Sequence, residues 1–405
     1  MDFAAILQEL FSGVFYLCSL DGFKTLVMFI IAGILIALAI VKDYEPTLLL
    51  PIGFGCILAN LPPAIDALTG ISAPSVLGDS GFLAVLFDAG IANELFPVLI
   101  FIAVGAMIDF SPLLKDPSMI FFGAAAQFGI FITFLLSLLV LPLIPGLVAE
   151  GDTNMVMKLA SAIGIIGAAD GPTTLFVANH FQLKDYMGPI SVAAYCYMAL
   201  VPVIQPPVIK LLTTREERMI RMDYQEERCS KVTLILFPII VTVVAGIIVP
   251  MSAPLVGSLM FGNLIRECGV LERLSKTAQN ELANLVTILL GITIGGTMVA
   301  DKFLDLTTIL ILLLGIFAFV FDTAGGVLFA KFLNLFRKKK VNPMIGAAGI
   351  SAFPMSSRVI AKMALKEDPS NFILMQSTSA NVSGQLGSIV AGGMVITLVS
   401  MLLGA

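Results

Sequence analysis

The sequence predicts an all-α polytopic membrane protein made of two inverted repeats, and three observations support this fold class. Hydrophobic residues make up 58% of the 405 residues and charged residues only 13%, and the mean hydropathy is +1.01, which excludes a soluble domain of this length. Apolar stretches recur about every 25–30 residues along the chain. Each half also contains one apolar stretch that is interrupted by a proline beside polar residues.

The predicted elements follow one order twice. Residues 1–23 are expected to form an N-terminal amphipathic or membrane helix, and the sequence leaves open whether it crosses the membrane. The first repeat, 24–212, has spans near 24–42, 46–60, 94–109, 118–143 and 186–212 and a broken hairpin at 155–182. A charged linker at 213–231 follows. The second repeat, 232–405, has spans near 232–250, 254–265, 284–300, 306–335 and 371–403 and a broken hairpin at 342–366.

Short motifs recur in the same order in the two halves, and this shared order supports an internal duplication. The matched pairs are Phe54-Gly55 with Phe261-Gly262, Gly105-Ala-Met107 with Gly296-Thr-Met298, and the broken segments Gly164 to Thr174 with Gly346 to Ser356.

Lysine and arginine are distributed unevenly among the predicted loops. They occur in the linker, in loop 266–283 and in the turn 337–340, whereas 61–93 and 144–157 have none. The positive-inside rule places the basic loops in the cytoplasm. Five spans in each half make the repeats antiparallel, so the first hairpin enters from outside and the second from the cytoplasm. Both then end near the midplane, as in elevator-type transporters with a core and a scaffold bundle.

The first broken hairpin places an acid where the hydropathy indicates the bilayer. Asp170 precedes Gly171 and Pro172, and apolar residues flank the break on both sides. Pro172 removes a backbone donor and disfavours helix at Gly171, which leaves carbonyl groups without helical partners. A turn outside the membrane is the ordinary alternative. An intramembrane carboxylate is costly, however, so we interpret Asp170 as a cation ligand.

The second hairpin offers oxygen ligands and one fixed cation. Asn342 and Ser351 can bind a cation, and small residues such as Gly346 allow close helix approach before the break at Pro354. Arg358 can clamp a carboxylate that enters from the cytoplasm. The ordinary alternatives are a serine bonded to its own helix and a snorkelling arginine.

Further polar residues lie in the last span and beside the first hairpin. Asn381, with Ser383 or Ser388, can ligate a hard cation or join helices by hydrogen bonds. Tyr195 and Tyr197 can each be a proton donor or an interface anchor. Asp322 is a second intramembrane acid without an assigned role.

The inventory argues against several other functions. The five cysteines are scattered without metal-ligand spacing, and His180 is the one histidine, so a transition-metal site is not expected. No basic patch has interleaved aromatic residues, which argues against nucleic acid as a partner. Ala361-Lys362-Met363 lies in a membrane hairpin, so we do not expect biotin to be attached to this chain.

The segments 164–174 and 342–358 together with Asn381-Val-Ser-Gly-Gln385 resemble the beta subunit of sodium-pumping, biotin-dependent decarboxylases. That family includes oxaloacetate, methylmalonyl-CoA and glutaconyl-CoA decarboxylases. The resemblance spans nearly the whole chain. The family's functional residues fall on Asp170, Asn342, Gly346, Ser351, Arg358 and Asn381, and its tyrosine falls on Tyr195 or Tyr197, of which we favour Tyr197.

The resemblance implies a membrane subunit that decarboxylates carboxybiotin and moves sodium outward while consuming a proton. Asp170 and Asn381 would bind one sodium ion, and Asn342 and Ser351 would help to form a second site. Arg358 would orient the carboxyl group, and Tyr197 or Ser351 would relay the proton.

The implied partners are a biotin carrier that supplies carboxybiotin, a carboxyltransferase, a small membrane subunit and lipid. The subunit would sit in the bacterial inner membrane, in several copies per complex. The rival hypothesis is a secondary sodium/carboxylate transporter that uses the same hairpins without chemistry. A plainer alternative is a membrane scaffold whose polar residues only pack helices.

Overall fold

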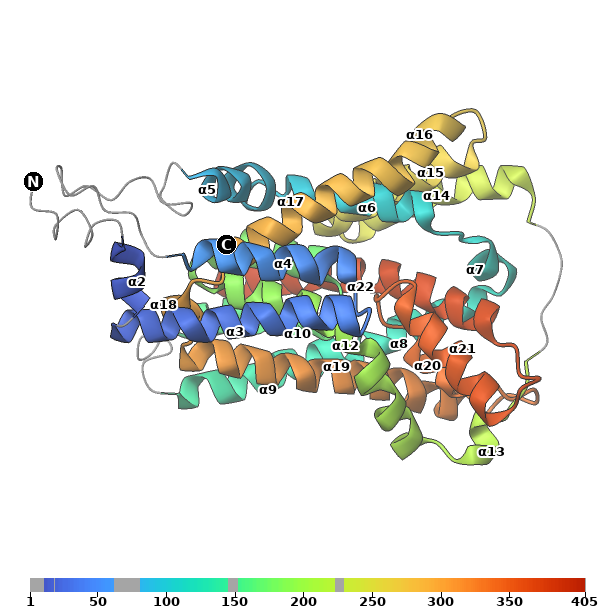
Figure 1. Cartoon of the computed structure of the whole chain (residues 1–405). Helices are drawn as coiled ribbons and strands as arrows, with labels where there is room; N and C mark the ends of the chain where they lie inside the picture. The colour runs from blue at the N-terminus through green and yellow to red at the C-terminus, as the bar shows by residue number, and fades with distance from the viewer. Residues whose placement is uncertain (1–10, 18, 62–80, 145–151, 223–228, 405) are drawn as a thin grey trace, which may run out of the picture.

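The computed structural model describes residues 11–17, 19–61, 81–144, 152–222 and 229–404, and every regular element in these ranges is a helix (Figure 1). The predicted N-terminal helix at 1–23 lies partly outside the described residues, where only α2 (Ser12–Leu17) and the start of α3 are seen. The all-α fold class is therefore confirmed for the described part of the chain.

Each predicted span corresponds to a helix or a helix pair. In the first half these are α3 (Leu20–Val41), α4 (Pro46–Ala59), α6 (Leu95–Met107), α8 (Ile120–Ala126) with α9 (Phe128–Val140), and α12 (Met187–Leu212). In the second half they are α14 (Lys231–Ile248), α15 (Ala253–Glu267), α17 (Ala283–Gly296), α19 (Leu306–Leu333) and α22 (Leu374–Leu403). The apolar period of the sequence thus locates the helices well.

Short helices connect these elements. They are α5 (Phe82–Leu86), α7 (Ser111–Lys115), α13 (Arg215–Arg218), α16 (Glu272–Thr277) and α18 (Ala300–Phe303), the π-helical turns Phe87–Ala92 and Ala278–Leu282, and 3-10 turns at Pro117–Met119, Leu141–Leu143, Lys184–Tyr186 and Pro250–Ser252. The expected loop 61–93 is thus helical over 82–92, because this stretch is itself apolar, and it meets α6 at an angle of 61°.

Some of the apolar helices are too short to cross a membrane upright. In the described residues five helices are long and apolar enough to cross a membrane, or up to seven if each of two bent pairs is one span. The helices α4, α15 and α17 have only 14, 15 and 14 residues, whereas an upright span needs about 20. Polar residues end α4 early, since Glu45 precedes it and Asn60 follows it.

The two broken hairpins are present. The first consists of α10 (Thr153–Ile166) and α11 (Gly171–His180), and the second of α20 (Met344–Ala347) and α21 (Met355–Glu367). In the first break Ala169 has a φ of 53°. The breaks touch, because the amide N–H of Ser351 donates to the carbonyl oxygen of Ala168 at 2.9 Å.

The helices form two packed groups. One group contains α3, α4, α6, α14, α15 and α17, and the other contains α8 to α12 and α19 to α22 around the two hairpins (Figure 1). Within the first group, α4 crosses α17 at Gly55 and α15 crosses α6 at Gly262, where a Cβ atom would overlap a backbone carbonyl of the partner helix. Glycine is therefore required at both crossings.

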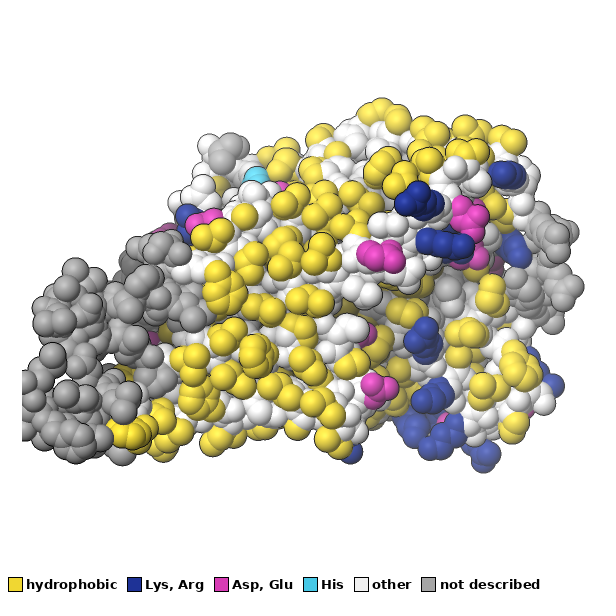
Figure 2. Space-filling model, turned by 45° about the horizontal axis from the view of Figure 1, so that its top comes forward, with side chains coloured by type: hydrophobic (Ala, Val, Ile, Leu, Met, Phe, Trp, Pro, Cys, Tyr) yellow, Lys and Arg dark blue, Asp and Glu magenta, His cyan; other side chains and the backbone are white. Residues whose placement is uncertain are grey.

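The basic loops share one end of the molecule. Lys and Arg side chains gather mostly at the right-hand end of the face in Figure 2, where the linker and α13 lie beside the second hairpin in Figure 1. We call this the basic end. Here the amide of Asn342 donates to the carbonyl oxygens of Arg218 and Ile220, both at 2.9 Å, which joins the linker to the start of the second hairpin.

Candidate ion-binding site

Asp170 is the N-cap residue of α11 and is buried, with 3% of its surface exposed. Its Oδ1 accepts a hydrogen bond from the amide of Thr173 at 3.1 Å, and its Oδ2 accepts one from the Thr173 hydroxyl at 2.7 Å. The carboxylate thus satisfies the first turn of the helix, as an N-cap aspartate does. The Gly-Pro pair that follows supplies a proline at the helix start, where its missing N–H costs nothing.

Two further hydroxyl groups reach the same carboxylate from distant segments. The Oγ of Ser388 on α22 lies 2.6 Å from Asp170 Oδ2, and the Oγ of Ser351 in the second break lies 3.1 Å from it. Three hydroxyl groups therefore surround one carboxylate oxygen. Carboxylate and hydroxyl oxygens are the ligand types that hard cations prefer, so this cluster has the chemistry of a site for such an ion.

Side-chain amides of α22 hold the second break beside Asp170. Asn381 donates through Nδ2 to the carbonyl oxygen of Ile350 at 2.6 Å, and Gln385 donates to the carbonyl oxygen of Ser351. Among the described residues, the Oδ1 atom of Asn381 has no hydrogen-bond partner although it is buried. A buried, unpaired amide oxygen is costly, and a cation in this cluster would supply its partner.

The two candidate tyrosines lie in different places. The ring of Tyr195 packs on Gly171, where a Cβ atom would overlap it, and its buried hydroxyl has no partner among the described residues. The hydroxyl of Tyr197 instead donates to the carbonyl oxygen of Leu312 on α19. The hydroxyl of Tyr197 is therefore bonded elsewhere, because residues two positions apart on a helix point about 200° apart, and Tyr195 is the tyrosine beside Asp170.

Asn342 is not part of the cluster. It lies at the basic end, where its Nδ2 bonds the linker and its Oδ1 accepts from the amide of Met344 at 3.1 Å. We expect Asn342 among the sodium ligands from the sequence, whereas in the structure the start of the hairpin separates it from Ser351 and both of its polar atoms bond backbone groups. Asn342 thus fixes the start of the second hairpin to the linker, away from the cluster at Asp170.

Arg358 lies in the first turn of α21 and is exposed, seven residues after Ser351 in the chain. Burial raises the pKa of Glu45, the N-cap residue of α4, and the positive charge of Arg358 lowers it in part. Arg358 therefore faces α4 of the other helix group. Its guanidinium can meet an anion that enters between the groups.

Close backbone contacts hold the second hairpin in place. A Cβ atom on Gly346 would overlap the carbonyl group of Gly326 on α19. Gln205 of α12 donates to the carbonyl oxygen of Ala347 at 2.8 Å and accepts from the hydroxyl of Ser356 at 3.0 Å. The break itself lies at Pro354, which follows a cis peptide bond.

Asp322 is a separate buried acid. Its carboxylate lies between Gly129 at the start of α9 and Gly167 at the end of the first hairpin's inner arm, since Cβ atoms there would meet its Oδ1 and Oδ2 atoms. It is fully buried and makes no hydrogen bond with Asp170. Its place at the N-terminus of α9 suits a negative charge, and neither of its carboxylate oxygens has a hydrogen-bond partner among the described residues.

The described residues contain no group of three His, Cys, Asp or Glu side chains that could hold a metal ion. Thr173 and Ser388 complete the cluster around Asp170. Thr173 was not predicted, although its position three residues after an aspartate before proline is a capping signal. Ser388 was an alternative to Ser383, and the hydroxyl of Ser383 instead donates to the carbonyl oxygen of Met119 at 3.0 Å.

Comparison with known proteins gives consistent matches over nearly the whole chain. The family model described as Na+-transporting oxaloacetate decarboxylase beta subunit matches residues 24–399. Methylmalonyl-CoA decarboxylase subunit beta of Propionigenium modestum is 45% identical over 388 residues, which cover 92% of this chain and 94% of that protein. Oxaloacetate decarboxylase beta chain of Klebsiella pneumoniae is 43% identical over 418 residues, with 92% and 94% covered. Methylmalonyl-CoA decarboxylase subunit beta of Veillonella parvula is 44% identical, with 98% and 99% covered.

Proposed function

The chain belongs to the family of Na+-transporting oxaloacetate decarboxylase beta subunits, and from this membership we propose how its residues couple decarboxylation to sodium movement. It is a multi-pass membrane subunit of a decarboxylase sodium pump and works in a complex with other subunits. The proposal concerns the ion site, the group that is decarboxylated and the motion that links them.

The sodium ion binds at Asp170. The observation that carries this proposal is the meeting of Ser351 and Ser388 on Asp170 Oδ2, at 3.1 and 2.6 Å, from three segments of the chain. With sodium present, these hydroxyl groups turn their oxygen atoms toward the ion, and the unpaired Oδ1 of Asn381 becomes a further ligand. The charge of the ion offsets the cost of a carboxylate in the membrane.

The decarboxylated group is carboxybiotin, brought by a biotin carrier that a carboxyltransferase has loaded. Arg358 pairs with its carboxylate, because a guanidinium binds a carboxylate through two parallel hydrogen bonds. Cleavage of the N–CO2 bond releases carbon dioxide and leaves the electron pair on the ureido nitrogen, which takes up one proton. Tyr195 replaces Tyr197 as the relay beside Asp170, with Ser351 as the alternative.

Outward sodium transport must be coupled to decarboxylation, because transport against the membrane potential costs free energy. Moving one positive charge outward against 100 mV costs about 2.3 kcal/mol, and the decarboxylation supplies it. Because Ser351 and Arg358 belong to one hairpin, a change in occupancy at either group moves the same element. Asn342 acts as a positioning residue in place of its expected role in a second sodium site, since it fixes the start of that hairpin.

The motion is that of an inverted-repeat transporter. A helix of each half crosses a helix of the other half at a matched glycine, α4 with α17 at Gly55 and α15 with α6 at Gly262. These paired crossings support two repeats, and we propose that the group that contains them is the scaffold. The group with both hairpins is then the core, which slides across the bacterial inner membrane with the ion. The beta-subunit names of its relatives imply further subunits, and we propose that this subunit assembles in several copies with a small membrane subunit.

Sodium-22 uptake by inverted vesicles that contain the whole complex tests this function. We expect uptake that depends on the donor acid or acyl-CoA and stops when avidin blocks the biotin. Uptake driven by a carboxylate gradient without donor, and insensitive to avidin, would instead establish the secondary transporter.

A further inference from the structure

A cavity of about 680 Å³ lies at the basic end, on the far side of α22 from the ion site. Its lining comes from α7, the linker, the turn after α19 and the first turns of α22. Ser379, on its wall, and Ser388, at the ion site, are nine residues apart on α22, which separates them by about 14 Å and half a turn. The cavity is therefore a different site from the one at Asp170.

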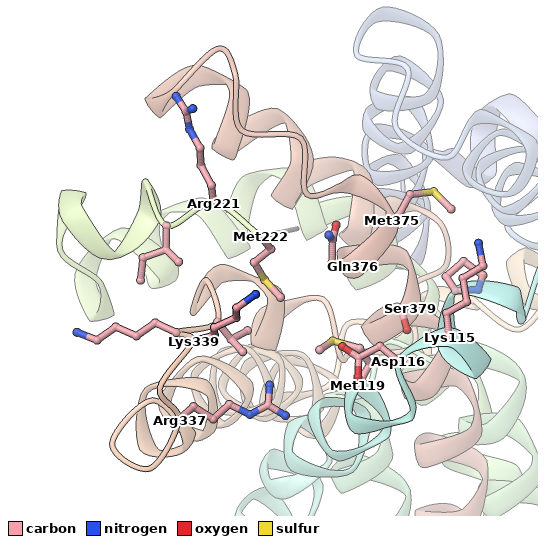
Figure 3. A pocket seen from close by; sticks show the side chains of 14 residues that line it. Lys115, Asp116, Met119, Arg221, Met222, Arg337, Lys339, Met375, Gln376 and Ser379 are labelled. Atoms are coloured by element: carbon pink, nitrogen blue, oxygen red, sulfur yellow. The ribbon is translucent and has the colours of Figure 1, made fainter. Parts of the chain in front are cut away.

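The lining is strongly cationic. Its basic residues are Lys115, Arg221, Arg337, Lys339 and Lys340, and its one acid is Asp116. The charge of Arg221 is paired with Asp368, which is not part of the lining, so the positive charge of the lining comes mainly from the other four residues. Asp116 accepts hydrogen bonds from the amide and the hydroxyl of Ser118. Figure 3 shows Arg337 and Lys339 on one side of the cavity and Lys115 on the other. Such a ring of positive charge selects an anion.

The interior of the cavity can also bind neutral polar and apolar groups. Met119, Met222 and Met375 give it flexible apolar walls. Ser379 in the wall is buried, with 1% of its surface exposed. Its Oγ has no hydrogen-bond partner among the described residues. An occupant with oxygen atoms would satisfy this hydroxyl.

Two of the segments that line the cavity lead along the chain to large exposed apolar side chains. Met119 immediately precedes α8, whose Phe121 is 58% exposed, and Arg337 immediately follows Phe336, which is 73% exposed. The helices α8 and α19 pack side by side, with the rings of Phe122 and Phe329 in contact. Both belong to candidate membrane spans. The cationic cavity is thus continuous with two membrane helices that expose large apolar side chains.

We propose that this cavity binds the headgroup of an anionic phospholipid, with the acyl chains along the exposed side chains of α8 and α19. Basic pockets between membrane helices at the cytoplasmic side are suited to such headgroups. A soluble anion would use the positive charge but not the adjoining apolar surface. The lipid joins the linker, α19 and α22, which are parts of the chain that the hairpin core must keep together as it moves.

The test is native mass spectrometry of the complex reconstituted with phosphatidylglycerol or with phosphatidylcholine. The variant R337Q/K340Q removes two charges from the lining, and the matched control K42Q/R273Q removes two exposed charges elsewhere. Melting temperatures of both variants verify the fold. We expect retained phosphatidylglycerol on the wild type and on the control, and about thirty-fold weaker binding to R337Q/K340Q, because each basic residue near a headgroup contributes roughly a factor of five.

Competition identifies the kind of anion. Phosphatidylglycerol that excess inorganic phosphate or a polyglutamate peptide does not displace supports the proposal. Equal retention of phosphatidylcholine, unchanged binding to R337Q/K340Q, or full displacement by either soluble anion would overturn it. The result is independent of sodium transport, because none of these residues contacts Asp170.

Discussion

The hydroxyl of Ser388 donates to Asp170 Oδ2 at 2.6 Å, although 218 positions separate the two residues in the sequence. This bond joins α22 to the first hairpin at the point where the second hairpin, through Ser351, also arrives. One carboxylate thus holds three elements together. Anything that changes the charge at Asp170 changes all three contacts at once, which is the property that a coupled ion site needs.

Replacing Ser388 by alanine should weaken sodium binding. The S388A variant loses one oxygen ligand and one hydrogen bond to a charged group, which contributes about 1.5–3 kcal/mol. We expect the sodium concentration for half-maximal decarboxylation to rise at least about tenfold. S383A is the matched control, since Ser383 lies on the same helix and bonds Met119 instead. Equal sodium dependence in S388A and S383A would contradict the assignment.

The two tyrosines should respond differently to loss of the hydroxyl. Y195F removes a hydroxyl without a described partner beside Asp170, so we expect normal stability and decarboxylation slowed by about a hundredfold, as for loss of a proton donor. Y197F removes the bond to Leu312 and should cost about 1 kcal/mol of stability with little effect on rate. Rates and melting temperatures of both variants decide this, and a slow Y197F with a normal Y195F would reverse the choice.

Adding one methyl group at Gly346 should destabilise the protein. In G346A the new Cβ overlaps the Gly326 carbonyl, and overpacking of this kind costs about 1–3 kcal/mol. The control is G33A on α3, where no atom lies within 4 Å of the new Cβ. We expect a melting temperature several degrees lower for G346A alone, measured by thermal unfolding in detergent. A G346A protein as stable as G33A would mean that α20 and α19 are farther apart than in this structure.

The ion pair of Arg221 with Asp368 should make the linker sensitive to acid. Hydrogen bonds from Arg221, at 2.7 and 3.1 Å, hold the pKa of Asp368 below its ordinary value of 3.8. Because the folded-state pKa is the lower one, the pair stabilises the fold above pH 3.8 and loses this effect as the pH falls through the lowered pKa.

Hydrogen-exchange protection of amides 215–222 measures that effect. We expect D368N to be less protected than the wild type at neutral pH, and the two proteins to converge in acid once Asp368 is protonated. A difference that stays constant across the pH range would show that the pair does not contribute.

Much of the fold could be predicted because membrane helices are encoded locally. Apolar length placed α3, α19 and α22 within a few residues, and the sequence Asp170-Gly171-Pro172 located the first break. The sequence predicts spans near 46–60, 254–265 and 284–300 for the short helices α4, α15 and α17, but hydropathy does not measure how far a helix is tilted or how deeply it crosses.

The site could be predicted only in part because it depends on contacts between distant segments. An acid beside a helix breaker marks Asp170 without any structure. Which serine of α22 faces Asp170 depends on the rotation of that helix about its axis. In the structure Ser388 faces Asp170, whereas Ser383 bonds the carbonyl oxygen of Met119 beside α8. Which of Tyr195 and Tyr197 lies beside Asp170 depends in the same way on the rotation of α12. The chemistry of Asn342 fits a ligand as well as it fits a cap, and in the structure both of its polar atoms bond backbone groups.

Sodium-22 binding and sodium-dependent decarboxylation in reconstituted vesicles can compare the two buried acids, and this comparison decides whether Asp170 binds sodium. D170N removes the charge at the ion site, whereas D322N makes the same change at Asp322, which does not touch that site. We expect D170N to lose saturable sodium binding and coupled transport, and D322N to keep the sodium dependence of the wild type. Wild-type sodium dependence in D170N would show that sodium does not bind at Asp170.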